Sequence, residues 1–134
     1  MEIQLPIRVY IEDTDAGGIV YYVNYLKYME RARTEFLRNL GFSKTAIFDD
    51  HAMFVVQRVE IDYSAPARLD DALVVSASIA RLGRASMIFD QFVRDDQKML
   101  CHASIRVACV DRESLRPMAV PKAIREKLQQ SSIT

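Results

Sequence analysis

A cluster of acidic residues followed by two glycines contains the residue types in this chain that are best suited to chemistry. Glu12, Asp13 and Asp15 precede Gly17 and Gly18, and a tyrosine-rich segment follows directly. A carboxylate can activate water or attack a carbonyl carbon, and the unpaired N–H groups at a helix start can stabilise the oxyanion that forms. The pattern therefore favours acyl transfer from a carbonyl substrate.

The segment after the glycines is predicted to be the one long helix, which begins at Val20 or Asn24. Its apolar residues recur every three or four positions and so share one face: Tyr25, Met29, Ala32, Phe36 and Leu40. Gly41 suits the left-handed residue after a helix, and Phe42 is placed to pack back on Leu37 as in a Schellman motif. The helix is therefore predicted to end at Leu40.

The rest of the chain predicts strands. They are expected at residues 3–11, 53–63, 73–80, 85–94 and 99–110. In the second of them, Met53, Val55, Gln57, Val59, Ile61 and Tyr63 are expected to share one face. The last three are joined by short connections, which favours antiparallel hairpins. We predict an α+β fold in which a five-stranded antiparallel sheet wraps around one long helix.

The strand at residues 85–94 predicts an oligomer. Ile88 and Phe92 fall on one of its faces, while Met87, Phe89 and Val93 fall on the other. A sheet that is apolar on both faces needs a second partner besides the helix, and the simplest partner is another copy of the chain. We therefore expect a homo-oligomer, either a dimer or a tetramer.

Length and composition narrow the class of protein. With 134 residues, 50% of them hydrophobic and 27% charged, the chain is expected to form a single domain over residues 1–134, with residues 117–134 as a C-terminal appendage. Lys plus Arg and Asp plus Glu number 18 each, which argues against nucleic acid as a partner. No stretch approaches the roughly 18 apolar residues of a membrane span, and we expect a cytoplasmic protein without integral membrane association.

The residues that bind metals or carry redox chemistry are scattered. A calcium loop would need glutamate at its twelfth position, where this segment has Asn24. Cys101 and Cys109 lack C-x-x-C spacing and are expected to be reduced and buried. His51 and His102 lack metal-ligand spacing and are expected to be non-catalytic. We predict no metal site.

Three motifs resemble one known family. Residues 10–35 read Tyr-Ile-Glu-Asp-Thr-Asp-Ala-Gly-Gly-Ile-Val-Tyr-Tyr-Val-Asn-Tyr-Leu-Lys-Tyr-Met-Glu-Arg-Ala-Arg-Thr-Glu, residues 63–66 read Tyr-Ser-Ala-Pro, and residues 81–91 read Arg-Leu-Gly-Arg-Ala-Ser-Met-Ile-Phe-Asp-Gln. Together they resemble hotdog-fold acyl-CoA thioesterases of the 4-hydroxybenzoyl-CoA type, in particular the bacterial subgroup associated with the Tol–Pal envelope system. The resemblance covers nearly the whole chain.

This resemblance implies a fold, an activity and a site. It implies dimers that extend the sheet, active sites at the subunit interface, and hydrolysis of acyl-CoA to free acid and CoA without a cofactor, since CoA belongs to the substrate. It maps the catalytic carboxylate onto Asp15, as general base or nucleophile, and the oxyanion donor onto the Tyr22 backbone N–H. Asp13 is then a turn residue. From the residues themselves, Gly17 and Gly18 are expected to let the backbone approach the substrate closely, and Tyr21 and Tyr25 to line an acyl pocket at the aromatic helix start. The resemblance implies that Arg84 contacts the CoA phosphates.

One position departs from the subgroup, and two other functions stay open. Tyr22 stands where the Tol–Pal subgroup usually has histidine, so no imidazole is expected to act there. A hotdog dehydratase or isomerase would need a histidine near the helix, and neither His51 nor His102 lies near it in sequence. The other alternative is a non-catalytic acyl-carrier or envelope-system adaptor. Acyl carrier protein is a further candidate partner, and the resemblance favours a tetramer made of two dimers.

Overall fold

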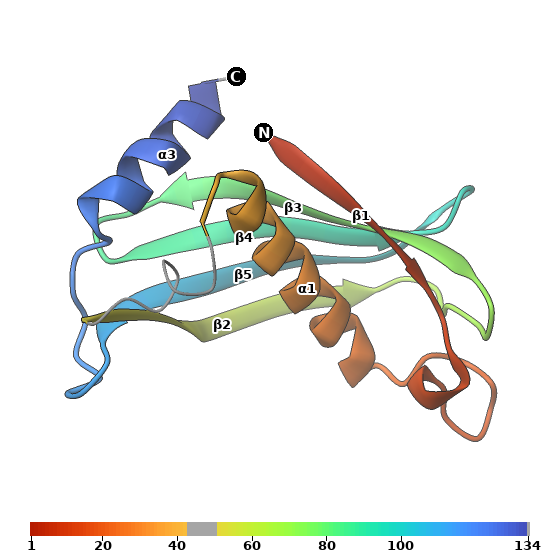
Figure 1. Cartoon of the computed structure of the whole chain (residues 1–134). Coiled ribbons are helices and arrows are strands. Elements are labelled where there is room, and N and C mark those ends of the chain that lie inside the picture. The colour runs from red at the N-terminus through yellow and green to blue at the C-terminus, as the bar shows by residue number, and fades with distance from the viewer. Residues whose placement is uncertain (43–50, 134) are drawn as a thin grey trace.

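The computed structural model describes residues 1–42 and 51–133. Along the chain it contains β1 (Glu2–Arg8), the short 3-10 helix η1 (Ile11–Asp13), α1 (Val23–Asn39), β2 (Ala52–Tyr63), β3 (Ala72–Leu82), β4 (Ser86–Arg94), β5 (Met99–Asp111) and α3 (Lys122–Ile133) (Figure 1). No helix within these described ranges is both long and apolar enough to cross a membrane.

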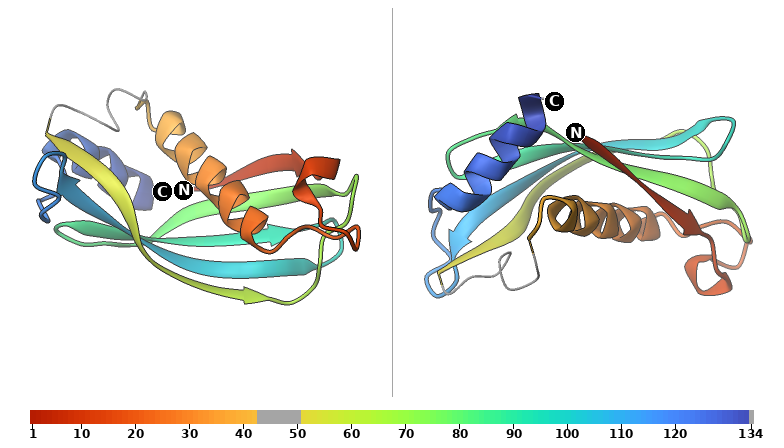
Figure 2. Two further views of the ribbon diagram at one scale, coloured as in Figure 1. Left: turned by 90° about the horizontal axis from the view of Figure 1, so that it is seen from below. Right: turned by 45° about the horizontal axis from the view of Figure 1, so that its top comes forward.

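The five strands form one antiparallel sheet in the order β1-β3-β4-β5-β2. The sheet curves around α1, which lies along its concave side (Figure 2). The predicted α+β architecture, with the sheet wrapped around one long helix, is confirmed. β3, β4 and β5 are neighbours joined by hairpins, as the short connections predicted.

The apolar stripe of α1 forms the centre of the core. Tyr25, Met29, Ala32 and Phe36 are all at most 3% exposed. The Phe36 ring packs edge-on against Phe89 of β4, with centroids 5.5 Å apart. Burying each large apolar side chain contributes about 1.5–3 kcal/mol, so this face holds α1 against the sheet.

The predicted C-terminal signal of α1 is confirmed. Gly41 has a φ of +93°, a left-handed conformation that favours glycine. The Phe42 N–H donates to the Leu37 carbonyl at 3.1 Å, and the Gly41 N–H donates to the Arg38 carbonyl at 2.9 Å, which is the hydrogen-bond pattern of a Schellman motif.

Strand β1 is shorter than the predicted strand at residues 3–11. It ends at Arg8 because the chain turns into η1. There the Asp13 carboxylate accepts a hydrogen bond from the Tyr10 N–H at 2.9 Å. This local bond replaces strand pairing and brings the acidic residues back towards α1.

The prediction of which residues share one face of β2 is wrong for the first half of the strand. The pairing with β5 shifts by one residue between Val56 and Arg58, so Gln57 is an extra residue in the strand. Because a one-residue shift exchanges the faces, Met53 and Val55 do not share a face with Val59 and the residues after it. Phe54 and Val56 join Val59 on the side facing α1, where all three line grooves beside the helix.

The C-terminal segment belongs to the core, in contrast to the predicted appendage. Val120, Ile124 and Leu128 are at most 5% exposed and join the main hydrophobic cluster. The Arg125 guanidinium donates to the carbonyls of Gly83 and Arg84 at 2.7 and 2.8 Å. α3 therefore fastens the turn between β3 and β4.

Strand β4 alternates between two faces as predicted. Met87, Phe89 and Val93 are buried on the side of α1, whereas Ile88 and Phe92 are half-buried on the other side. That second face also carries polar residues. Between Ile88 and Phe92 stands Asp90, whose carboxylate lies 2.6 Å from Nε2 of His102 on β5.

Candidate active site

The acidic segment forms a tight hairpin ahead of α1. The Asp15 N–H donates to the Ile19 carbonyl at 2.9 Å, and the Tyr21 N–H donates to the Asp13 carbonyl at 3.0 Å. Gly18 closes the turn by donating to the Asp15 carbonyl at 3.1 Å, with a φ of +78° that suits glycine. Asp15 lies at the tip of this hairpin. The Asp13–Tyr21 pair lies at its base, next to the helix.

The Asp15 side chain is exposed and held by one hydrogen bond. Its Oδ1 accepts from the Gly17 N–H at 2.8 Å, while Oδ2 has no hydrogen bond within the described residues. A Cβ at Gly17 would lie 3.3 Å from Asp15 Oδ1, so the missing side chain leaves room for the carboxylate. One carboxylate oxygen is therefore fixed and the other is available to water or to a substrate.

The start of α1 offers unpaired backbone donors. Tyr22 precedes the first helical residue, Val23, and in residues 1–42 and 51–133 neither N–H has an acceptor, whereas the Asn24 N–H donates to the Tyr21 carbonyl at 2.8 Å. These two donors lie at the positive end of the helix dipole. They are suited to an oxyanion, and the role of the Tyr22 N–H stays a prediction.

Asp13 is occupied with holding the hairpin and the helix start. Its carboxylate accepts from the Tyr10 N–H, and its carbonyl accepts from both the Tyr21 N–H and, at 2.8 Å, the Asn24 side-chain amide. The hydroxyl of Tyr28 is buried without a partner among the described residues. Burial, with a smaller contribution from Asp13, raises the pKa of Tyr28 well above its usual value. These contacts support the expectation that Asp13 is a turn residue.

Tyr63, at the end of β2, contacts the candidate site, although we predicted no site role for it from the sequence. Its hydroxyl donates to the Tyr22 carbonyl at 3.2 Å, and its ring lies 6.0 Å from that of Tyr22 and 5.6 Å from that of Tyr25. The available signal was its position at the strand end, as the first residue of the Tyr-Ser-Ala-Pro motif. Tyr63 ties the helix start to the sheet.

The predicted substrate contacts differ in their accessibility. Tyr21 and Tyr22 are 48% and 57% exposed, with ring centroids 5.0 Å apart. Tyr25 is only 3% exposed, and its hydroxyl accepts from the Ala67 N–H at 2.9 Å. The burial of Tyr25 argues for a supporting role behind the loop and against direct contact with a ligand.

Arg84 lies far from Asp15 within one protomer. It stands in the turn between β3 and β4, which is beside α3 at the opposite end of the sheet from the loop before α1 (Figure 1). There Arg81, Arg84 and Arg106 line a pocket of about 470 Å³. A single copy of the chain therefore does not bring Arg84 and Asp15 together.

Two grooves follow the side of α1 that faces β2. The first, of about 170 Å³, begins at Val23 beside the unpaired donors and is lined mainly by Leu26, Val59 and Ile105. The second, of about 400 Å³, continues towards the helix end and is lined mainly by Leu37, Phe54, Met87, Phe89 and Val107. The apolar surface closest to the helix start is thus the first groove.

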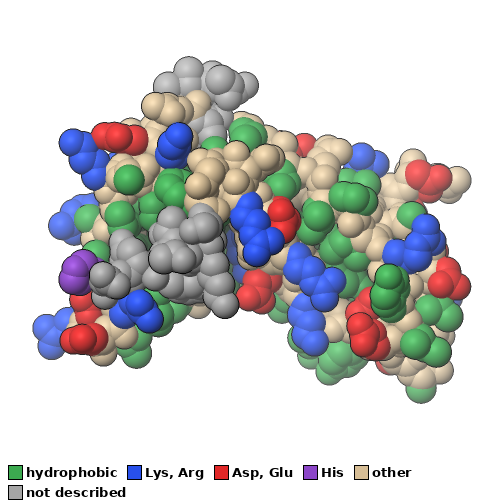
Figure 3. All heavy atoms as spheres, in the orientation of Figure 1, with side chains coloured by type: hydrophobic (Ala, Val, Ile, Leu, Met, Phe, Trp, Pro, Cys, Tyr) green, Lys and Arg blue, Asp and Glu red, His purple; other side chains and the backbone are tan. Residues whose placement is uncertain are grey.

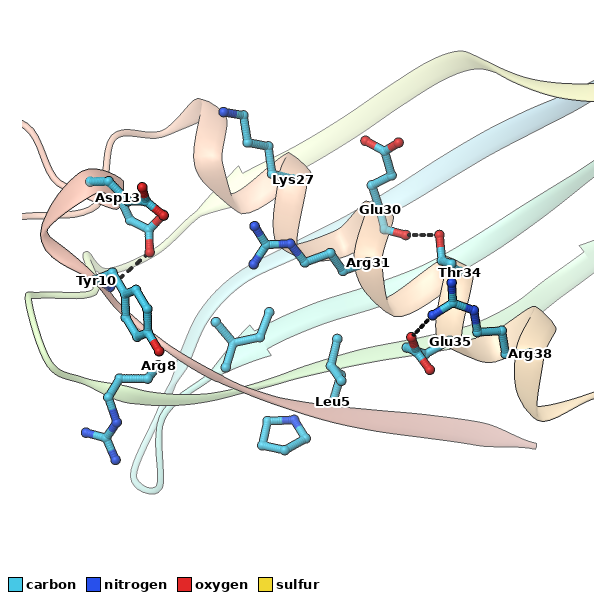
Figure 4. A pocket seen from close by; sticks show the side chains of 13 residues that line it. Leu5, Arg8, Tyr10, Asp13, Lys27, Glu30, Arg31, Thr34, Glu35 and Arg38 are labelled. Carbon is cyan, nitrogen blue, oxygen red and sulfur yellow. Dashed lines mark hydrogen bonds and ion pairs between the residues drawn. The ribbon is translucent and has the colours of Figure 1, made fainter. Parts of the chain in front are cut away.

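A different cleft, of about 900 Å³, separates α1 from β1 (Figure 4). Charged side chains of both signs line it, including Lys27, Arg31, Glu30 and Glu35, and Asp13 stands at one end. Positive and negative side chains are also interspersed over the face in Figure 3. Asp15 does not line this cleft, so we place the candidate site at the helix start instead.

Within residues 1–42 and 51–133, no three His, Cys, Asp or Glu side chains gather as a metal site would require. The predictions for the two cysteines are confirmed, since Cys101 and Cys109 are buried thiols outside any disulfide among the described residues. His102 pairs with Asp90 on the second face of the sheet, away from Asp15.

A curved antiparallel sheet around one helix, with an exposed carboxylate in the hairpin before that helix, is the architecture of a hotdog-fold protein. Residues 17–102 match the family described as the thioesterase superfamily. The chain is 43% identical to the acyl-CoA thioesterase YbgC of Haemophilus influenzae, over 90% of this chain and 89% of that protein. It is also 43% identical to the acyl-CoA thioester hydrolase YbgC of Escherichia coli O157:H7, over 93% and 94% of the two chains.

Solved structures agree. A probable thioesterase from Bartonella henselae superposes with a TM-score of 0.85 at 34% identity, covering 90% of this chain and all of that one. The chain belongs to the thioesterase superfamily.

Proposed function

We propose that this protein hydrolyses acyl-CoA thioesters to the free acid and CoA. The observation that carries the proposal is the exposed Asp15 carboxylate, held by the Gly17 N–H and followed by a helix whose first donors are unpaired. Relatives that are 43% identical bear the names acyl-CoA thioesterase and acyl-CoA thioester hydrolase, which supports the same substrate class.

The geometry suits hydrolysis with Asp15 as general base or nucleophile. As base, Asp15 takes a proton from water while the water oxygen bonds to the thioester carbon; as nucleophile, its carboxylate bonds to that carbon first and water releases the acid afterwards. In both routes the carbonyl oxygen becomes an oxyanion at the Tyr22 N–H, and the C–S bond then breaks. The leaving thiolate is a weak base, so this step needs little acid assistance.

We infer that the working unit is a dimer built on the free edge of β2. Val56, Val59 and Tyr63 are 50%, 37% and 44% exposed along this strand, which within the described part of the chain pairs only with β5. Antiparallel pairing of two β2 edges across a two-fold axis extends the sheet. It also brings the end of the partner's sheet that carries the β3–β4 turn towards Asp15.

This dimer gives the arginine pocket a role. Arg81, Arg84 and Arg106 provide three cations around one pocket, and arginine is well suited to phosphate groups. The CoA phosphates of a substrate at one Asp15 then meet the partner subunit's Arg84. This arrangement reconciles the distance between Asp15 and Arg84 in one protomer with a shared function.

A CoA-release assay on a panel of straight-chain and aromatic acyl-CoAs tests the activity. The proposal expects turnover of at least one substrate class, and loss of turnover in Asp15→Asn. A folded protein that binds acyl-CoA without releasing CoA would instead favour an acyl-carrier or adaptor function. Conversion of an enoyl- or hydroxyacyl-CoA without CoA release would favour a dehydratase or isomerase.

Mixing two inactive variants tests the shared site. Asp15→Asn and Arg84→Ala chains are each expected to be defective alone when acyl-CoA is limiting. Co-expressed, they form mixed dimers with one intact site, made of Asp15 from one chain and Arg84 from the other, and activity returns in part. Absence of any recovery in verified mixed dimers would mean that both residues act within one subunit or that Arg84 takes no part.

A further inference from the structure

The two grooves beside α1 meet at a polar neck. Glu30, Arg33 and Val56 line both the 170 Å³ groove at the helix start and the 400 Å³ groove beyond it. Glu30 and Arg33 come from α1, and Val56 comes from β2. The remaining lining on either side is mainly apolar. An acyl chain that entered at Val23 would therefore meet a charged constriction before it reached the second groove.

Arg33 is fixed at this neck by a buried amide. Its Nη1 donates to Oε1 of Gln91 on β4 at 2.9 Å. Gln91 is 0% exposed, and its amide nitrogen donates to the carbonyls of Met29 and Ser76 at 2.9 and 3.0 Å. Because both amide protons are committed, the Gln91 oxygen has to face Arg33. The fully buried Gln91 side chain thus holds the Arg33 guanidinium in place.

The position of Arg33 is electrostatically unusual for a helix surface residue. Burial lowers the pKa of Arg33, and the nearby Glu30 acts in the opposite direction. Displacing Arg33 would leave the Gln91 oxygen buried without this donor, and passing a hydrocarbon chain beside the guanidinium would remove its remaining water. Both changes are unfavourable, so the neck resists an apolar group.

We propose that Arg33 is a specificity-determining residue that closes the far end of the acyl pocket. The inference rests on the proposed thioesterase function and names the acyl group that fits it. The first groove, at about 170 Å³, is close in size to an apolar cavity of roughly 150 Å³ that accommodates benzene. The preferred acyl group is therefore one of about six carbons, either a short straight chain or a single ring.

Chain-length profiles test the proposal. We would measure kcat and KM for straight-chain acyl-CoAs from acetyl to palmitoyl in wild-type protein and in Arg33→Met, which keeps an unbranched side chain but removes the charge. The wild type is expected to lose kcat/KM for chains longer than about six carbons. Arg33→Met joins the two grooves and raises the ratio of long-chain to short-chain kcat/KM by at least roughly tenfold. Arg33→Lys, which keeps the charge, should retain the wild-type profile.

Arg31→Met is the matched control. Arg31 is exposed on the same helix but lines the cleft towards β1, so its removal should leave the profile unchanged. Should Arg33→Met fail to fold, Val56→Ala widens the same neck from β2 and is expected to act in the same direction.

An unchanged profile in a folded neck variant, or a wild type that prefers long chains, would overturn the assignment of Arg33. That outcome is distinct from failure of the proposed function, which would appear as no CoA release by wild-type protein from any substrate.

Discussion

Two carboxylates only two residues apart have different surroundings in this protein. Asp13 is engaged through both its carboxylate and its carbonyl, which together bind Tyr10, Tyr21 and Asn24. Asp15 is exposed, with one oxygen bonded to the Gly17 N–H. At the residue scale this difference supports the proposed assignment of a positioning role to Asp13 and a reacting role to Asp15.

Asp15→Asn is expected to lower kcat by roughly 10²- to 10⁴-fold, because the amide neither takes a proton nor attacks the thioester. Far-UV circular dichroism and a thermal melt check that the fold is intact. Asp13→Asn serves as the comparison and should cost less activity. A larger loss in Asp13→Asn than in Asp15→Asn would move the reacting group to Asp13.

Tyr22→Phe is expected to keep most of kcat. The proposed oxyanion donor is the backbone N–H, which the substitution preserves, and the contact from Tyr63 is accepted by the Tyr22 carbonyl, which also remains. Steady-state kinetics with one good substrate suffices. A collapse of kcat in this variant would assign a direct role to the Tyr22 hydroxyl.

The Cys101 thiol predicts a pH effect on stability. Burial raises its pKa to about 12, whereas a free cysteine ionises near pH 8.5. The unfolded chain therefore loses this proton first, and the free energy of unfolding falls as the pH rises from about 8.5 towards 12, by up to about 1.4 kcal/mol per pH unit.

Urea unfolding at pH 8 and pH 10 measures this effect. Tyr25, Tyr28 and Tyr63 have pKa values shifted in the same direction, so the contribution of the thiol is the difference between wild-type protein and Cys101→Ala. The wild type should lose more stability than the variant over this interval. Equal losses in the two proteins would contradict the assignment.

At the scale of elements, the C-terminal helix is part of the structural framework. α3 places Ile124 and Leu128 in the main core, and through Arg125 it holds the turn that carries Arg84. The element that fixes the proposed phosphate contact is thus α3, far in sequence from the hairpin that carries Asp15.

Leu128→Ala is expected to lower the free energy of unfolding by about 2–5 kcal/mol, as for other fully buried leucines. Leu128 is 1% exposed. Chemical denaturation followed by circular dichroism provides the measurement, and Lys127→Ala, at an exposed neighbouring position, is the control. If Leu128→Ala changed stability no more than the control, α3 would have to be a detachable appendage.

At the scale of the whole molecule, two surfaces of the sheet remain for other copies of the chain. Among the described residues, β2 is an edge strand with exposed apolar side chains, which suits the proposed dimer. The second face of β4 and β5 carries Ile88 and Phe92 with the Asp90–His102 pair between them. This mixed face suits a contact between dimers.

Phe92→Asp is expected to convert a tetramer into dimers, because it places a charge beside Asp90 on the second face. Activity should persist, since the β2 edge is untouched. Light scattering combined with the CoA-release assay reports both properties, and Arg94→Gln on the same face is a milder control. A wild-type protein that is already monomeric, or a Phe92→Asp protein with unchanged mass, would remove this second contact.

Much of this molecule could be predicted from local patterns. The buried stripe of α1, the left-handed Gly41 and the hairpins among β3, β4 and β5 depend on residues close in sequence. The hairpin that carries Asp15 is equally local, because two aspartates followed by glycines favour a turn before a helix. Short-range hydrogen bonding and periodic burial therefore determined the fold class and the location of the candidate site.

Other features were decided only by tertiary packing. The faces of β2 changed because the register against β5 admits Gln57 as an extra residue, which no alternation within β2 reveals. The hydrogen bond from Tyr63 to Tyr22 and the one from Arg33 to Gln91 both join elements that are distant in sequence. Such contacts depend on how the sheet curves around α1, and that curvature results from packing the whole core at once.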